Sequence, residues 1–148
     1  MKVIANNKRA TYDYDISIKI NSGLVLTGSE VKSLRVNSSS IKEAYVAEKN
    51  GELWLCNCHI KRYHSSSDKV IDPIRQRKLL ISKKDLNKLL GSVKKDGFSI
   101  IPLSIYFNEN GLVKLNIGLG RGKKKYDKRQ SQKLKDWNKN KQRLLKNN

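Results

Sequence analysis

The chain has 148 residues, of which 37% are hydrophobic, and it carries a formal net charge of +19. This length predicts one domain, and the one-signed charge predicts a polyanionic partner, with nucleic acid first and an anionic membrane surface as the alternative. No apolar run approaches the ~18 residues of a spanning helix, and the residues after Met1 show no secretory h-region. Because Cys56 and Cys58 give no disulfide framework, we expect a cytoplasmic protein that binds no membrane.

The first quarter of the chain predicts two strands and a short helix. Residues 12–20 alternate strictly between apolar and polar side chains, which is typical of a half-buried strand. Residues 21–23 (Asn-Ser-Gly) predict a turn, after which residues 24–26 begin another strand. A helix is then expected up to about Val36, with Thr27 as its N-cap and Glu30 as the capping-box partner.

The middle of the chain predicts a β-hairpin. Residues 44–49 and 52–57 flank Asn50-Gly51, a strong signal for a two-residue turn. On the second arm, Leu53 and Leu55 are expected on one face, and the opposite face is expected to carry Trp54, Cys56 and Cys58. Residues 64–71 are polar and serine-rich, so we predict a mobile loop there.

The second half predicts one helix and a further hairpin. Ser82 is the expected N-cap, the apolar stripe comprises Leu86, Leu89, Leu90 and Val93, and Gly97 is the expected C′ residue. Residues 98–107 and 112–119 are the expected hairpin arms. The whole pattern favours a mainly β fold: a small closed antiparallel β-barrel of OB type, with about six strands and two or more short helices, over residues 1–120.

Residues 121–148 form a basic tail with twelve Lys or Arg and two Asp. We interpret the glycines of residues 118–122 as a flexible exit from the last strand. Leu134, Trp137, Lys141, Leu144 and Leu145 fall at helical spacing. Because closely spaced lysines repel each other, the tail is expected to be disordered in isolation and helical when it lies along phosphates.

The sequence offers little catalytic chemistry. It has no nucleophile elbow, no phosphate-binding loop and no cluster of histidines with carboxylates. Cys56, Cys58, His59 and His64 lack the spacing of a zinc knuckle. We therefore expect no metal, no cofactor and no enzyme, although a hydrolase that uses His59 and His64 is kept as a minor hypothesis.

Basic residues recur beside the expected turns and short helices, in company with Tyr12, Trp54 and Tyr63. They are Lys8, Arg9, Lys32, Arg35, Lys61, Arg62, Arg75, Arg77 and Lys78. Each pair alone is an ordinary solvated charge, but the set together with the tail favours RNA contact. Glu30 has two interpretations: a helix cap, or an acceptor for base or 2′-hydroxyl donors.

Several segments, in this order along the chain, resemble small protein B (SmpB), the family that binds transfer-messenger RNA (SsrA RNA) in bacterial trans-translation. They are residues 7–10, 23–35, 59–63, 72–80, 102–107, 118–124 and 127–129. The resemblance implies an OB-type barrel that works as an RNA-binding adaptor and has no catalytic role. It would bind the tRNA-like domain of transfer-messenger RNA as a monomer and deliver it to stalled ribosomes. The tail would occupy the decoding centre of the small subunit and the empty mRNA channel.

Carried over by position, the resemblance implies two sets of RNA-binding residues. Candidates for the tRNA-like domain are Lys8, Arg9, Glu30, Lys32, Arg35, Arg75, Arg77 and Lys78. Candidates for the ribosome, all in the tail, are Lys123, Lys124, Tyr126, Asp127, Lys128, Arg129, Lys135 and Trp137. The chain departs from the family pattern at Gln76, Gly120 and Tyr126 and in residues 64–71. A general single-stranded RNA-binding or ribosomal OB-fold protein is the alternative function.

Overall fold

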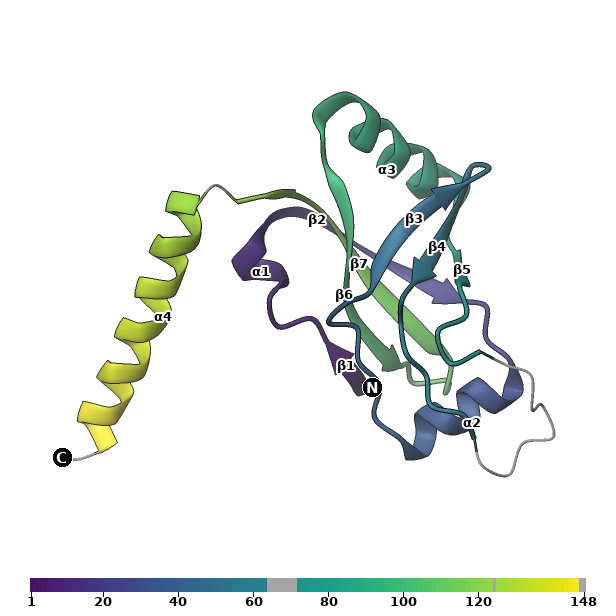
Figure 1. Cartoon of the computed structure of the whole chain (residues 1–148), viewed down its shortest axis with the longest axis horizontal. Helices are drawn as coiled ribbons and strands as arrows, with labels where there is room; N and C mark the ends of the chain where they lie inside the picture. Colours follow the sequence, from purple (N-terminus) through teal and green to yellow (C-terminus); the bar gives the residue numbers. More distant parts are fainter. Residues whose placement is uncertain (64–71, 124, 147–148) are drawn as a thin grey trace.

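A computed structural model describes residues 1–63, 72–123 and 125–146 of the chain. Seven strands in these residues form one antiparallel sheet in the order β1-β6-β7-β2-β5-β4-β3 (Figure 1). The strands are β1 (Lys2–Asn6), β2 (Tyr14–Leu24), β3 (Tyr45–Lys49), β4 (Glu52–Cys56), β5 (Arg77–Leu80), β6 (Ser99–Phe107) and β7 (Val113–Gly122). The helices are α1 (Ala10–Asp13), α2 (Gly28–Val36), α3 (Lys83–Asp96) and α4 (Lys125–Lys146).

The sheet curls around the core but does not close, so the predicted closed barrel is wrong. β1 and β3 are its two outer strands, and they do not pair with each other within the described residues. The mainly β class and the antiparallel hairpins are confirmed. Alternating apolar residues look the same in an open and a closed sheet, which is why the sequence pattern could not separate the two.

Strand β2 is the longest strand and differs from its prediction at both ends. At the start, Tyr12 lies in α1, so the strand begins at Tyr14. At the end, the turn predicted at residues 21–23 is wrong, because these residues pair with residues 114–116 of β7. The Ser22 hydroxyl donates to the Leu115 carbonyl at 3.0 Å. Pairing with β7 therefore outweighs the local turn propensity of Asn, Ser and Gly.

The predicted hairpin at Asn50-Gly51 is confirmed. Both residues have positive φ, 53° and 77°, as a type I′ turn requires, and β3 pairs with β4 on either side. The predicted face of Cys58 is wrong. Asn57, with φ 57°, interrupts the alternation after β4, and Cys58 joins the core cluster that contains Leu53 and Leu55.

The predicted helix caps are confirmed. The Thr27 hydroxyl accepts from the Glu30 N–H while the Glu30 carboxylate accepts from the Thr27 N–H, which is a complete capping box at the start of α2. At α3 the Ser82 hydroxyl accepts from the Asp85 N–H, and Gly97 takes the left-handed conformation.

Gly118 and Gly120 belong to β7, so their interpretation as a flexible exit is wrong. Both are buried, and β7 continues to Gly122, which pairs with Tyr14. A Cβ atom at Gly120 would lie 2.9 Å from the Asp15 carbonyl oxygen. These glycines allow β2 and β7 to approach closely, which fixes where the tail leaves the sheet.

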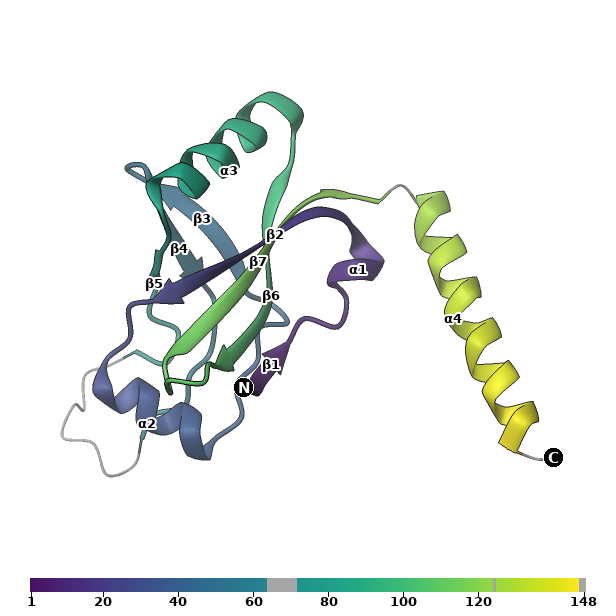
Figure 2. The ribbon, with the colours of Figure 1, turned by 180° about the vertical axis from the view of Figure 1, so that it is seen from behind.

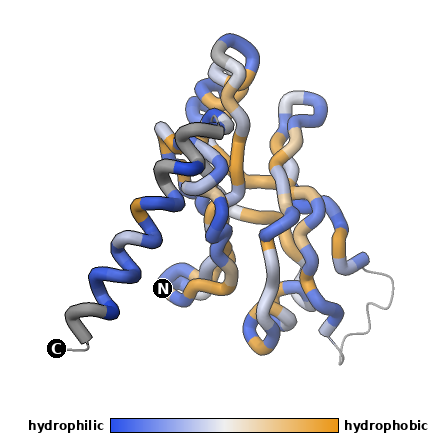
Figure 3. The backbone as a smooth tube through the Cα atoms, turned by 60° about the vertical axis from the view of Figure 1, so that its left-hand side comes forward, coloured by the Kyte–Doolittle hydropathy of each residue, from blue (hydrophilic) through white to orange (hydrophobic). Residues whose placement is uncertain are grey.

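Helix α4 stands outside the sheet in Figures 1 and 2 and is mostly hydrophilic in Figure 3. Within the described residues, α4 contacts α1 of the body. Disorder of the tail in the free protein concerns the chain in solution and stays a prediction. Within the described residues, no helix combines the length and the apolar character needed to span a membrane.

A candidate nucleic-acid interface

The first candidate surface is formed by α2 and the segment that leads into β5. The capping box fixes the start of α2, and the helix buries Glu30, Ser33 and Leu34 on one side. Lys32 and Arg35 are exposed on the remaining sides. A single helix thus directs a carboxylate inward and two cations outward.

A buried ion-pair network lies beneath this surface. The Glu30 carboxylate is 4% exposed, and its two oxygens are bound separately. Arg75 Nη2 lies 2.5 Å from one oxygen, and Arg77 Nε donates to the other at 2.8 Å. The Arg77 side chain has no exposed surface and also donates to the carbonyls of Cys58 and Pro73. Arg77 therefore joins α2, the exit of β4 and the segment before β5.

The network sets the charge state of Glu30. Burial by itself raises the pKa of this carboxyl, but hydrogen bonds from Arg75, Thr27 and Arg77, with the positive charge of Arg77, outweigh burial and hold the pKa below its usual value. Glu30 is therefore an ionised, fully engaged carboxylate at neutral pH.

These contacts separate the predicted body residues into two kinds. Glu30 and Arg77 are occupied inside the protein. Arg75 is about one-third exposed, and Lys78, which forms an ion pair with Glu52 at 3.0 Å, is similarly accessible. We use the name α2 surface for the accessible cations of this set: the exposed Lys32 and Arg35 of α2, with Arg75 and Lys78.

Lys8 and Arg9 belong to a different place. They precede α1, which lies far from α2 in both Figure 1 and Figure 2. The Arg9 guanidinium lies over the Tyr12 ring at 5.0 Å, and the Lys135 ammonium of α4 lies over the same ring at 5.7 Å. The structure thus brings together a predicted body residue and a predicted tail residue through Tyr12.

Two further contacts at the base of the tail were missed by the sequence reasoning. The Lys123 N–H donates to the Asp13 carbonyl at 2.8 Å, and the Arg121 guanidinium stacks over the Phe98 ring at 4.5 Å. The alternation of residues 12–20 predicts a strand at Tyr12, and no local pattern connects Phe98 with Arg121. These contacts determine the direction in which the tail begins.

The structure describes only some of the predicted RNA-binding residues of the tail. Arg129, Lys135 and Trp137 are exposed, Trp137 by 65%. Lys124 lies outside the described residues, and so do the side chains of Tyr126, Asp127 and Lys128. Their contacts with ribosomal RNA stay predictions.

The described residues contain no group of three or more His, Cys, Asp or Glu side chains that could hold a metal ion. His59 is exposed and follows β4, whereas His64 lies outside the described residues. Both cysteines are buried, and burial raises the pKa of the Cys58 thiol despite the nearby positive charge of Arg77.

Comparison with known proteins gives concordant results. The family model for the SmpB protein matches residues 4–147. SsrA-binding proteins of Ehrlichia canis (strain Jake) and of the Wolbachia of Brugia malayi are each 51% identical over all 148 residues and are covered over 100% and 99% of their own lengths. A solved structure described as "tmRNA-SmpB: a journey to the center of the bacterial ribosome" contains a chain that is 42% identical with a TM-score of 0.67. The match covers 84% of this chain and 87% of that one.

Proposed function

The chain belongs to the SmpB protein family, and we propose that it is the RNA-binding adaptor of trans-translation in its bacterium. In this role it binds the tRNA-like domain of transfer-messenger RNA and delivers that RNA to stalled ribosomes. Its tail enters the decoding centre and the empty mRNA channel. The observation that carries the proposal is the full-length similarity to proteins named SsrA-binding protein.

The α2 surface supports the first step. Its cations (Lys32, Arg35, Arg75 and Lys78) come from a helix and a strand that Arg77 and Glu30 tie together. A rigid platform loses little entropy when it binds a folded RNA, and phosphate contacts fix the register of the two molecules. This arrangement suits a folded tRNA-like domain better than a flexible single strand.

The tail supports the second step. We propose that residues 1–120 are the RNA-binding body and that residues 121–148 are a basic tail, disordered in isolation and helical on the ribosome. Leu134 and Trp137 are 61% and 65% exposed, so this apolar pair lacks a partner within the described part of the body. Charge alone would need no such pair, whereas a helix that packs in a ribosomal RNA channel would use it.

The proposed role requires no catalytic group, metal or cofactor, and it places the protein in the cytoplasm, where ribosomes work. Lys8 and Arg9 stay candidates for the tRNA-like domain. Their position beside Tyr12 and Lys135 means that RNA bound there would also approach the tail.

A binding competition tests the proposal. The full chain should bind the tRNA-like domain far more tightly than an RNA duplex of equal charge at fixed salt. Salt must be fixed because phosphate binding weakens steeply with ionic strength. Replacing Lys32 and Arg35 by Ala should weaken tRNA-like-domain binding by about tenfold or more. The control Lys83→Ala with Lys84→Ala removes the same charge from the start of α3 and should have a much smaller effect. Equal affinity for the two RNAs would contradict the proposal.

The alternative is a general single-stranded RNA-binding protein. Such a protein would stack bases on aromatic side chains and prefer an unstructured strand. Tighter binding of an unstructured RNA of equal length than of the tRNA-like domain would favour this alternative.

A further inference from the structure

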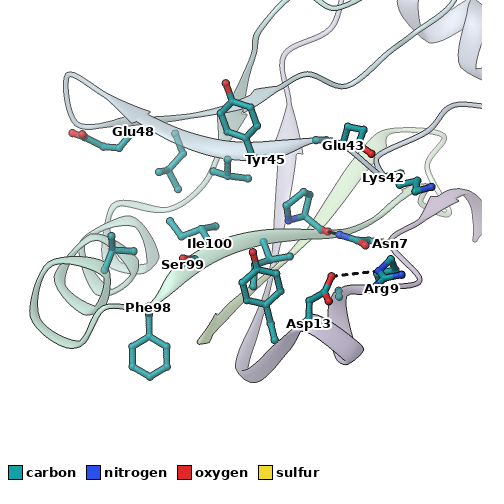
Figure 4. A pocket seen from close by; sticks show the side chains of 18 of the residues that line it. Asn7, Arg9, Asp13, Lys42, Glu43, Tyr45, Glu48, Phe98, Ser99 and Ile100 are labelled. Atoms are coloured by element: carbon teal, nitrogen blue, oxygen red, sulfur yellow. Dashed lines mark hydrogen bonds and ion pairs between the residues drawn. The ribbon is translucent and has the colours of Figure 1, made fainter. Parts of the chain in front are cut away.

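The outer edge of β3, on the side away from its paired strand β4, borders a groove between β3 and β6. This groove, of about 680 Å³, is bounded by β3, β6, α1 and the second half of α3, and we call it the β3 groove (Figure 4). It follows from the open sheet described above, because β3 and β6 come close without pairing in the described residues.

The β3 edge offers backbone groups to a partner. Asn50-Gly51 forms a two-residue type I′ turn, so the flanking pair Lys49 and Glu52 exchanges both of its backbone hydrogen bonds. Pairs alternate along an antiparallel ladder, and Val46 and Glu48 therefore direct their N–H and C=O groups away from β4. Both residues line the β3 groove.

The opposite wall is already covered at one end. β1 pairs with β6 from Ser104 to Phe107, and the Asn7 backbone and side chain donate to the carbonyls of Leu103 and Pro102. Residues 99–101 pair with β7, and within the described chain no strand lies on their other side. The groove is thus open along the edge of β3 and closed where Asn7 lies.

The floor and rim of the groove have a definite chemistry. Leu90 and Val93 of α3 supply apolar surface together with Ile100 of β6, whereas the Phe98 ring points away from β3 in Figure 4. Tyr45 and Val93 at the rim are 55% and 36% exposed. Such surface can take an apolar side chain from a bound segment.

The charge of the groove is opposite to that of the chain. Asp13, Glu43 and Glu48 line it against only Arg9 and Lys42, and Arg9 already pairs with Asp13 at 3.6 Å. The Glu48 carboxylate accepts from the Gly51 N–H, and Glu43 is exposed. In a chain with a net charge of +19, the carboxylates of Glu43 and Glu48 are local acceptors for lysine or arginine.

We propose that the β3 groove binds an extended, basic peptide segment of a protein partner by strand addition. The segment pairs with β3 through Val46 and Glu48, places an apolar side chain over Ile100 and Val93, and directs its cations to Glu43 and Glu48. Main-chain pairing provides the affinity of such contacts, and the side-chain pockets provide their selectivity. Arg9 at the end of the groove is also a candidate contact for the tRNA-like domain, whereas Val46, Glu43 and Glu48, to which the peptide binds, are not among those candidates.

The test uses the full chain, free of RNA, and a capped six-residue peptide of alternating lysine and valine. Hydrogen exchange and NMR titration should show protection and shift changes at the amides of Val46 and Glu48. Methylation of the peptide's backbone nitrogens on its pairing edge should abolish binding, because it removes the donors that strand addition needs.

Charge reversal tests the role of the two carboxylates. Glu43→Lys together with Glu48→Lys should weaken binding at least about fivefold. Glu109→Lys with Asp136→Lys makes the same change in charge at exposed sites outside the groove and should have a smaller effect. Because the Glu48 carboxylate also supports the hairpin turn, the single variant Glu43→Lys serves as a second measurement and should weaken binding by itself.

The following results would overturn the proposal: no binding up to about 1 mM peptide; equal binding of a glutamate–valine peptide or of the methylated peptide; or a single-stranded RNA that shifts the same amides. Self-association that protects the β3 edge would assign the groove to a second copy of the chain and would overturn the proposal as well.

Discussion

The α4 tail and the ion-pair network beneath the α2 surface contain the same basic residue types in opposite surroundings. Arg77 in the network has no exposed surface and three internal acceptors, whereas Arg129 and Lys135 in α4 are exposed. A buried cation holds segments of the fold together, and an exposed cation is available to phosphates. The location of a positive charge therefore decides whether its loss unfolds the protein or weakens RNA binding.

Removal of the tail should have the largest functional effect and almost no effect on the fold. A stop codon after Lys123 keeps β7 and the hydrogen bond from the Lys123 N–H to the Asp13 carbonyl. We expect tagging on stalled ribosomes to be lost. The free energy of unfolding should change by less than about 0.5 kcal/mol, because exposed residues contribute little to stability. A ribosome rescue assay and urea unfolding measure the two quantities.

Tagging by the shortened chain would contradict the functional role of the tail. Unfolding of that chain at a much lower urea concentration would contradict the separation of tail and body, because the tail would then be part of the core structure.

Arg77→Ala should produce the opposite result. It leaves the Glu30 carboxylate buried with a single arginine and removes the donors to the Cys58 and Pro73 carbonyls. Breaking a buried ion pair from one side costs about 3–5 kcal/mol. Urea unfolding measures the loss, with Arg129→Ala, an exposed arginine of α4, as the matched control. Equal stability of the two variants would show that the Glu30 network does not hold the fold.

Local signals predicted much of the fold. The capping box at Thr27, the turn at Asn50-Gly51 and the end of α3 at Gly97 each depend on a few adjacent residues. The path of β2 through Ser22 depends on β7, which lies far along the chain. Closure of the sheet depends on whether β1 and β3 meet, which adjacent residues cannot decide.

The candidate site residues also differ in whether local sequence or a distant partner determines their exposure. Lys32 and Arg35 are exposed as their helical positions suggested. Arg77 was predicted as an RNA contact because it stands among other basic residues, yet its burial depends on Glu30, 47 residues away in the sequence. A sequence pattern shows the charge of a residue, and the paired partner determines whether that charge faces solvent.

Acid should weaken the buried ion-pair network of Glu30. The pKa of Glu30 is lowered in the folded protein from a usual value of 4.5. The unfolded chain therefore takes up a proton at a higher pH than the folded protein does. The stabilisation is present above about pH 4.5 and is lost as the pH falls through the folded pKa.

Unfolding of the wild type and of Glu30→Gln as a function of pH measures this effect. The difference in their free energies of unfolding should be largest near pH 7 and shrink in acid. A difference that stays constant, or grows as the pH falls, would contradict the assigned charge state of Glu30.

The smallest effect is expected where the two regions meet, at Tyr12. Its ring lies against the Arg9 guanidinium and the Lys135 ammonium, and exposed contacts of this kind are worth about 0.5–1 kcal/mol. Tyr12→Ala should therefore raise the hydrogen exchange of the α4 amides about two- to fivefold. Tyr12→Phe keeps the aromatic face and should leave the exchange unchanged. If Tyr12→Ala also leaves it unchanged, α4 is independent of α1, and the tail is free of the body before any RNA binds.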